Sequence, residues 1–120
     1  MPHDPLVCVE DAIKACELIS QFIQGIEEED FYNDAKTKAA VEREIEIIGE
    51  ALNRIKTIDK EMLAKIDNWR EIIGFRNVIA HGYDVVEDEI VWESINNDIP
   101  LLVKQLETIK NDRGISKCHA

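Results

Sequence analysis

An arginine, an amide, a histidine and a tyrosine lie within eight residues of one another, at Arg76, Asn77, His81 and Tyr83. An arginine offers a planar cation that can hold a phosphate with two hydrogen bonds. A histidine can take a proton from a hydroxyl, or return one to a leaving oxygen, near neutral pH. Because RNA carries its own nucleophile, the ribose 2′-hydroxyl, these side chains point to phosphodiester cleavage without a metal ion.

The spacing of these residues limits how they can work together. Asn77 lies four residues before His81, so on a helix it shares a face with the imidazole and could orient it or touch the phosphate. Arg76 and His81 are five residues apart, which is about 140° around a helix of 3.6 residues per turn. Either the helix ends near His81, or the working site takes side chains from two copies of the chain.

A purely structural reading fits the same residues. Cations near a helix C-terminus interact well with the helix dipole, and Gly82 would be the ordinary left-handed terminator. Tyr83 would then be an aromatic residue that anchors the loop over residues 83–88. The spacing alone leaves both readings open.

Hydrophobic periodicity predicts helices along the rest of the chain, and no segment alternates with the period of a strand. Asp4 and Asp59 are predicted N-caps, as is either Asp67 or Asn68 before the motif helix. The acidic run over residues 27–30 reads as a solvated loop. The predicted helices cover residues 5–24, 34–57, 60–66, the motif segment from about 69 to 81, and 88 to Gly114.

The helix over residues 34–57 carries the strongest pattern, a seam with heptad-like spacing formed by Val41, Ile45, Ile48, Leu52 and Ile55. Gly49 lies inside this apolar region, where a small residue would let another helix approach closely. Glu50 beside it is either a surface acid or a partner for Arg76 or Arg70.

Two residues shape the neighbouring helices. Trp69 is expected in the core at the start of the motif helix. Pro100 interrupts the apolar stripe of the last helix and should kink it, because its ring clashes with the preceding turn.

The charge balance argues against a nucleic-acid partner. The chain has 25 acidic and 14 basic residues and a formal net charge of −11, so its long-range field repels RNA. Positive charge concentrated in one cleft, for instance around Arg76, Arg70 and their symmetry mates, could overcome this repulsion. Alternatively, the acidic surface serves to bind a basic protein partner.

The cysteines and the hydropathy set further expectations. Cys8 and Cys16 are two helical turns apart and fit one buried face, and with Cys118 the count is odd and without a Cys-x2-Cys pair. We therefore expect reduced core cysteines, no disulfide framework and no metal site. No apolar run approaches the length of a membrane span, and no signal peptide is visible, so we expect no membrane partner and a cytoplasmic location.

The motif resembles the Arg-x4-His-x-Tyr motif of HepT-like toxins in the HEPN superfamily. The resemblance covers roughly residues 5 to 110, most of the 120-residue chain. Outside the motif it rests on Ile48-Gly49-Glu50-Ala51-Leu52, Trp69, Val91-Trp92 and Ile99-Pro100-Leu101-Leu102.

The resemblance implies an all-α, HEPN-type bundle of four long helices plus a short one, as a single domain over residues 3–112 followed by a mobile tail over 113–120. It implies a homodimer that acts as a metal-independent ribonuclease toxin without a cofactor. The usual partner is a minimal nucleotidyltransferase antitoxin, which in the family transfers AMP onto the motif tyrosine, here Tyr83.

Two functions follow. In the first, His81 is general base or acid, Arg76 holds the phosphate, and Asn77 orients His81 or the phosphate. In the second, the chain is a non-catalytic helical subunit that docks a nucleotidyltransferase and helps to hold its nucleotide. The first requires RNA cleavage by the protein alone, and the second requires the partner.

Overall fold

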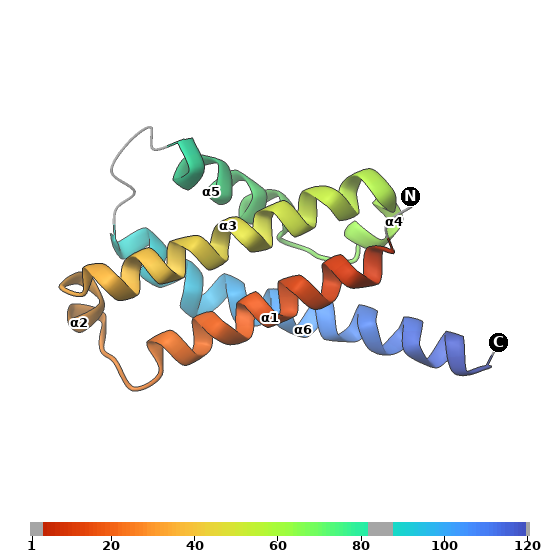
Figure 1. The fold of residues 1–120 in the computed structure, drawn as a ribbon, viewed down its shortest axis with the longest axis horizontal. Coiled ribbons are helices and arrows are strands. Elements are labelled where there is room, and N and C mark those ends of the chain that lie inside the picture. Colours follow the sequence, from red (N-terminus) through yellow and green to blue (C-terminus); the bar gives the residue numbers. More distant parts are fainter. Residues whose placement is uncertain (1–3, 82–87, 120) are drawn as a thin grey trace.

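The computed structural model describes residues 4–81 and 88–119, with the side chains of residues 78, 80, 81 and 113–119 left out. Within these ranges the chain is all-α, as predicted, with no strand. Figure 1 shows α3 through the middle of the bundle, with α1 and α6 on one side of it and α5 on the other. The helices are α1 (Pro5–Ile23), α2 (Glu28–Tyr32), α3 (Ala35–Ile58), α4 (Lys60–Leu63), α5 (Trp69–His81) and α6 (Asp88–His119).

Aspartates begin three of these helices. Asp4 accepts a hydrogen bond from the backbone N–H of Leu6 at 2.9 Å, and Pro5 follows at the first helical position. Asp34 and Asp59 begin α3 and α4 in the same way, each with a 3.0 Å bond from a backbone N–H three residues on. Each bond satisfies a donor that has no partner within the helix. The predicted starts at Asp4, Asp34 and Asp59 are confirmed.

The segment read as an acidic loop is a helix instead. Glu28–Tyr32 forms α2, and the backbone N–H of Glu27 donates to the Asp30 carboxylate at 3.2 Å. Phe31 anchors this helix, since it is fully buried and its ring centroid lies 5.2 Å from that of Trp92 on α6. Two of the helices in the described ranges are therefore short, where the sequence predicts one short helix.

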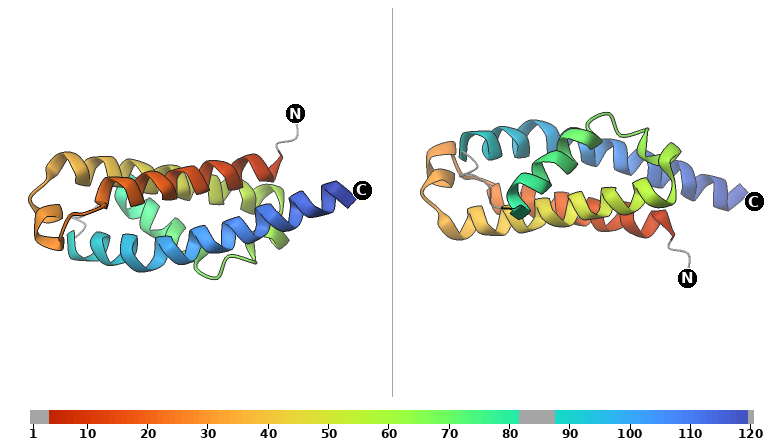
Figure 2. Two further views of the ribbon diagram at one scale, coloured as in Figure 1. Left: turned by 90° about the horizontal axis from the view of Figure 1, so that it is seen from below. Right: turned by 90° about the horizontal axis from the view of Figure 1, so that it is seen from above.

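The core forms where α1 packs against α3 and α6. All five seam residues of α3 are at most 2% exposed, which confirms the predicted seam. The apolar stripe of α6 belongs to the same core, and the helix itself runs along α1 (Figure 2). The buried members of this stripe are Val91, Ile95, Ile99, Leu102, Leu106 and Ile109.

Helix α6 is longer than predicted. Its backbone continues past Gly114 to His119, so the predicted end at Gly114 is wrong, because a helix already formed propagates through a single glycine. It also runs through Pro100 as one helix. Asn96, whose carbonyl loses its usual partner there, is exposed, so water can donate to it. The division into a domain over 3–112 and a tail over 113–120 stays a prediction.

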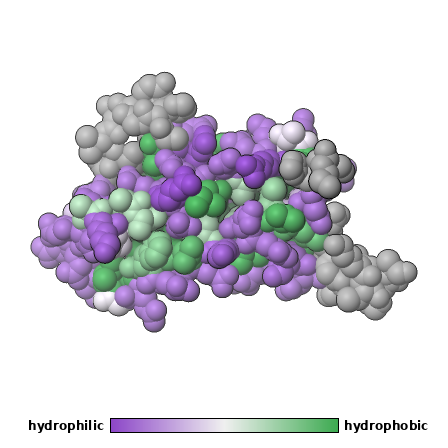
Figure 3. Space-filling model, viewed as in Figure 1, coloured by the Kyte–Doolittle hydropathy of each residue, from purple (hydrophilic) through white to green (hydrophobic). Residues whose placement is uncertain are grey.

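The surface is largely hydrophilic on the face shown in Figure 3, with apolar residues as a broken band between the polar ones. Among the described helices, none combines the length and the apolar character that a membrane span needs.

Burial of Leu52 generates the first prediction. Leu52 is 0% exposed in the α3 seam, whereas Leu101 on α6 is 41% exposed. Leu52→Ala should lower the free energy of unfolding by about 2–5 kcal/mol through lost apolar contact and a residual cavity. The chemically identical change Leu101→Ala should change it by no more than about 0.5 kcal/mol. Urea denaturation of both variants checks this, and equal losses would contradict the assignment of α3 as the centre of the core.

The cysteines generate the second prediction. Cys8 and Cys16 are buried free thiols on α1, as expected. Burial raises the pKa of Cys8, and it raises the pKa of Cys16 to about 12. Because the thiolate is the reactive form, both should resist iodoacetamide at pH 8 in a Cys118→Ser variant until urea unfolds the chain. Mass spectrometry counts the modified thiols, and rapid double alkylation of the native protein would contradict this prediction.

Candidate nuclease site on helix α5

Helix α5 carries Arg76, Asn77 and His81 of the motif and lies against α3 (Figures 1 and 2). Ile72 is 2% exposed in this contact, while Ile73, Phe75 and Ile79 are half-buried around it. These residues form the apolar side of the motif helix. Its exposed side includes Gly74 and Asn77.

The start of α5 is held differently from the predicted cap. Asp67 accepts from Gln105 Nε2 on α6, and its backbone N–H donates to Gln105 Oε1, both at 2.9 Å. Asn68 Nδ2 donates to the carbonyl of Asp98 at 3.1 Å, while Asn68 Oδ1 is buried without a hydrogen-bond partner. Neither side chain caps α5. Asp67 and Asn68 instead connect the start of α5 to α6 through these hydrogen bonds.

Trp69 is half-buried at the rim of the bundle and does not lie inside the core. The ammonium of Lys56 lies 5.5 Å from its ring centroid and the guanidinium of Arg70 lies 5.0 Å from it. Both cations are attracted by the face of the ring. Arg70 is thus placed on Trp69, six residues and about 240° around the helix from Arg76. Within one chain these two arginines point in different directions around the helix, and the predicted cluster of positive charge, which includes symmetry mates, stays a prediction.

Arg76 and Asn77 are brought together. Arg76 Nη1 donates a hydrogen bond to Asn77 Oδ1 at 3.1 Å. The Nε of Arg76 is buried and has no hydrogen-bond partner. The amide of Asn77 therefore holds the guanidinium through its oxygen, and its two N–H donors stay available for another group.

The other two motif residues lie at or beyond the limit of the described side chains. His81 is the last residue of α5, where the sequence places the end of the helix. Its side chain is outside the described part, and so are Gly82 and Tyr83. The roles of His81 and Tyr83 stay predictions.

Glu50 is a surface acid, and it does not reach Arg76 or Arg70. Its carboxylate accepts from Arg54 Nη2 at 3.0 Å, one turn along α3, with both side chains more than half exposed. Among the described residues, no carboxylate forms an ion pair with Arg76. Its positive charge is left for a ligand.

Gly49 lies directly opposite Arg76. It is buried in α3, and a Cβ built on it would lie 2.3 Å from Arg76 Cβ. This confirms that the small residue allows another helix to approach closely, and it identifies that helix as α5.

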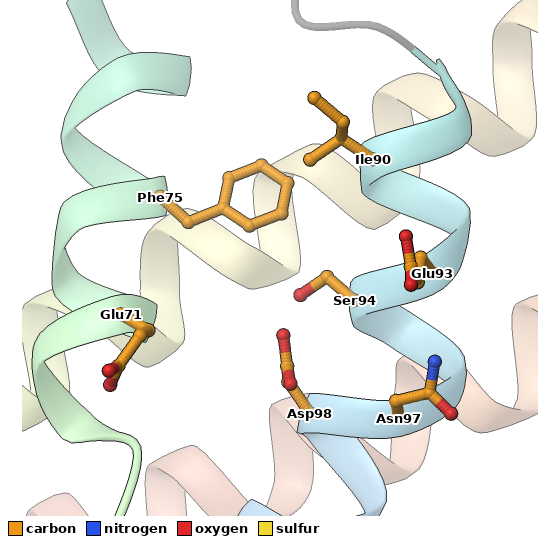
Figure 4. Close-up of a pocket in the computed structure, with 7 residues that line it drawn as sticks. All are labelled: Glu71, Phe75, Ile90, Glu93, Ser94, Asn97 and Asp98. Atoms are coloured by element: carbon orange, nitrogen blue, oxygen red, sulfur yellow. The ribbon is translucent and has the colours of Figure 1, made fainter.

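A cleft of about 270 Å³ lies between α5 and α6, beside the motif helix. Figure 4 shows its polar side chains gathered between the two helices, below Phe75 and Ile90. It holds three carboxylates and no cationic side chain, so it repels phosphate. Hydrophobic periodicity does not reveal this cleft, because its residues come from two different helices and the pattern of one helix does not show how it packs on another. The residues that line it are Glu71, Phe75, Ile90, Glu93, Ser94, Asn97 and Asp98.

Comparison with known proteins decides the family. The family described as Ribonuclease HepT-like matches residues 12–109, which include the whole motif. The chain belongs to the HepT-like ribonuclease family. The resemblance noted in the sequence is therefore confirmed, and with it the HEPN type of the helical bundle.

Individual relatives agree with the family match. A protein of Caldanaerobacter subterraneus subsp. tengcongensis assigned as an RNase is 36% identical over 88% of this chain and 93% of its own length. A protein of Thermococcus cleftensis assigned as a ribonuclease HepT is 38% identical over 85% of this chain and 92% of its own. A Methanocaldococcus jannaschii protein, also assigned as an RNase, is 33% identical over 85% of this chain and 84% of its own. No solved structure was found to match.

Proposed function

We propose that this HepT-like protein is the toxin of a toxin–antitoxin pair, a ribonuclease that cuts RNA without a metal ion. The observation that carries the proposal is the complete Arg76-x4-His81-x-Tyr83 set inside a match to a ribonuclease family. The geometry of Arg76 supports it, because the guanidinium is held by Asn77 and forms no described ion pair. We also propose a cytoplasmic location, because a ribonuclease toxin must meet its RNA substrate and its antitoxin in the same compartment.

In the proposed reaction the ribose 2′-hydroxyl attacks the adjacent phosphorus. His81 takes the proton of the hydroxyl, and the departing 5′-oxygen receives a proton from a second acid. The products are a 2′,3′-cyclic phosphate and a 5′-hydroxyl. Arg76 donates to the non-bridging oxygens, where negative charge develops in the transition state. Asn77 orients His81 or the phosphate with the amide N–H donors that Arg76 does not use.

A homodimer would supply the second acid. Arg76 and His81 stand about 140° apart on a helix, so side chains from two copies converge more readily than those from one. In a symmetric dimer the two His81 side chains can share the roles of base and acid across the two-fold axis. This dimer is part of the proposal.

The proposed regulator is a minimal nucleotidyltransferase antitoxin. The hydroxyl of Tyr83 would attack the α-phosphorus of ATP, form a bond to AMP and release pyrophosphate, with the phenolic proton lost to solvent. The AMP group would block the site by its bulk and its negative charge. A net charge of −11 and the carboxylates of Glu71, Glu93 and Asp98 support docking of a basic protein beside α5.

The same charges favour a second candidate function. A subunit that only docks a nucleotidyltransferase, and helps to hold its nucleotide through Arg76, needs no basic surface for RNA. The acidic cleft beside the motif helix is the specific observation in its favour. The two functions separate in an assay without any partner.

Cleavage of RNA by the purified protein is the first test. Wild type should cut RNA in the presence of EDTA, and His81→Ala should lose about 10²–10⁴-fold in rate because the proton transfer is lost. Arg76→Ala should lose activity as well, because the phosphate loses its cation. Arg54→Ala is the matched control, since Arg54 is an exposed arginine paired with Glu50 on α3, and it should keep wild-type activity.

Growth after induced expression without an antitoxin gives the same ranking in cells. Arrest by wild type and by Arg54→Ala, with relief by Arg76→Ala and His81→Ala, is the expected result. Cleavage and arrest that survive His81→Ala would overturn the proposed mechanism. Inactivity of wild type in both assays would favour the docking subunit.

Modification of Tyr83 is the second test. Incubation with a cognate nucleotidyltransferase and ATP should add one AMP group to the wild type, read by intact mass, and abolish cleavage. Tyr83→Phe lacks the acceptor oxygen, so it should gain no mass and stay active in the presence of the enzyme. Tyr32→Phe, at the chain's other tyrosine, should be modified like the wild type. Addition of AMP to Tyr83→Phe would place the acceptor elsewhere.

A further inference from the structure

The contact between α3 and α5 depends on a glycine, Gly49, which has no side chain. A Cβ added at Gly49 would lie 2.3 Å from both Cβ and Cγ of Arg76 and 3.1 Å from its Cδ. The first two separations are far inside van der Waals contact. The three atoms are the aliphatic stem that carries the guanidinium, so the stem occupies the space that any other residue at position 49 would fill.

Gly74, on α5 itself, shows that the close contact is specific to position 49 and is not common to every glycine in a helix. A Cβ added at Gly74 would meet nothing within 4 Å. Both glycines lie inside helices, where glycine is a poor helix former compared with alanine. At Gly74 alanine would fit the helix without obstruction, whereas at Gly49 the stem of Arg76 excludes it.

We infer that Gly49 is a positioning residue for Arg76, which it seats against the backbone of α3 so that the guanidinium has one fixed direction. This inference rests on the proposed role of Arg76 as the phosphate-binding cation. A carboxylate often orients an arginine, but Glu50, the acid next to Gly49, is paired with Arg54. The close packing of the Arg76 stem on Gly49 takes the place of such a carboxylate. Arg76 is thus held by its close packing on Gly49 and by the 3.1 Å hydrogen bond to Asn77. Its charge is not neutralised by a described neighbour.

Substitution at Gly49 must move α5. The closest atoms include Cβ of Arg76, which belongs to the frame of α5, so a change of side-chain rotamer cannot relieve the overlap. Moving from 2.3 Å to an ordinary contact of 3.4 Å requires a displacement on the order of 1 Å (3.4 − 2.3). A misplacement of this size at a reacting centre can lower a rate by about a hundredfold.

The first arm of the test measures RNA cleavage. Gly49→Ala should lower kcat/KM by about a hundredfold, and Gly74→Ala, the matched control, should keep the wild-type value. Because Arg76 acts on the charge of the transition state, the loss should fall mainly on kcat. Wild-type kinetics for a folded Gly49→Ala would overturn the inference.

The second arm does not depend on cleavage. The chain has five arginines, and the Nε–H signal of Arg76 in a ¹⁵N spectrum is assigned by its loss in Arg76→Lys. Gly49→Ala should shift this signal and leave those of Arg43 and Arg54 in place, and Gly74→Ala should leave it unmoved. An unshifted signal would overturn the inference. A shifted signal in a protein whose wild type cuts no RNA would keep the positioning contact and reject the proposed function.

A third comparison covers the case in which Gly49→Ala fails to fold. Arg76→Gly removes the three atoms that lie nearest to the new Cβ. Gly49→Ala added to Arg76→Gly should therefore fold with a urea midpoint equal to or above that of Arg76→Gly alone. If the double variant also fails to fold while Arg76→Gly folds, Gly49 serves the approach of the two backbones and not Arg76, and the inference is overturned.

Discussion

The packing of α5 on α3 at Gly49 is the contact on which the candidate site depends. Helix α3 is buried along its seam by the rest of the bundle, so its backbone is a fixed reference within the fold. The aliphatic stem of Arg76 packs directly on the backbone of α3, because Gly49 places no side-chain atom between the two helices. The position of a long and otherwise flexible side chain is thereby set by its packing against the buried helix α3.

The electrostatics of the site follow from where the acids are placed. A protein of net charge −11 has many carboxylates that could pair with a motif arginine, yet the nearest acid along α3, Glu50, is bonded to Arg54. The carboxylates of Glu71, Glu93 and Asp98 lie in the cleft between α5 and α6. An arginine without a carboxylate partner keeps its full charge for a phosphate. The acidic cleft limits the directions from which an RNA strand can approach α5.

The features predicted well from sequence are those fixed by local spacing. The seam from Val41 to Ile55, the stripe of α6 and the aspartate caps each depend on residues within one helix, and the structure confirms them. The close approach at Gly49 was also predicted, although its partner Arg76 was not, because nothing in a sequence pairs two helices residue by residue.

The features that were missed depend on contacts between distant segments. Helix α2 is held by Phe31, whose burial requires Trp92 on α6, and no periodicity can show a single anchoring residue. Asp67 has the sequence of a helix cap but is used by Gln105. Trp69 has the composition of a core residue, yet it lies between two cations at the rim, since a large aromatic ring can exchange burial for cation–π contact.

The geometry of α5 bears on how many copies of the chain form one site. The helix runs through His81, so Arg76 and His81, five residues apart, are separated by the full angle of about 140° around the helix axis. The stem of Arg76 cannot swing round the helix to compensate, because it is seated against Gly49 on the α3 side. The spacing alone predicts that a phosphate held by Arg76 of one chain is poorly placed for the histidine of the same chain. A second copy that brings its own His81 to that phosphate would satisfy both residues, which is why we propose a homodimer with a shared site.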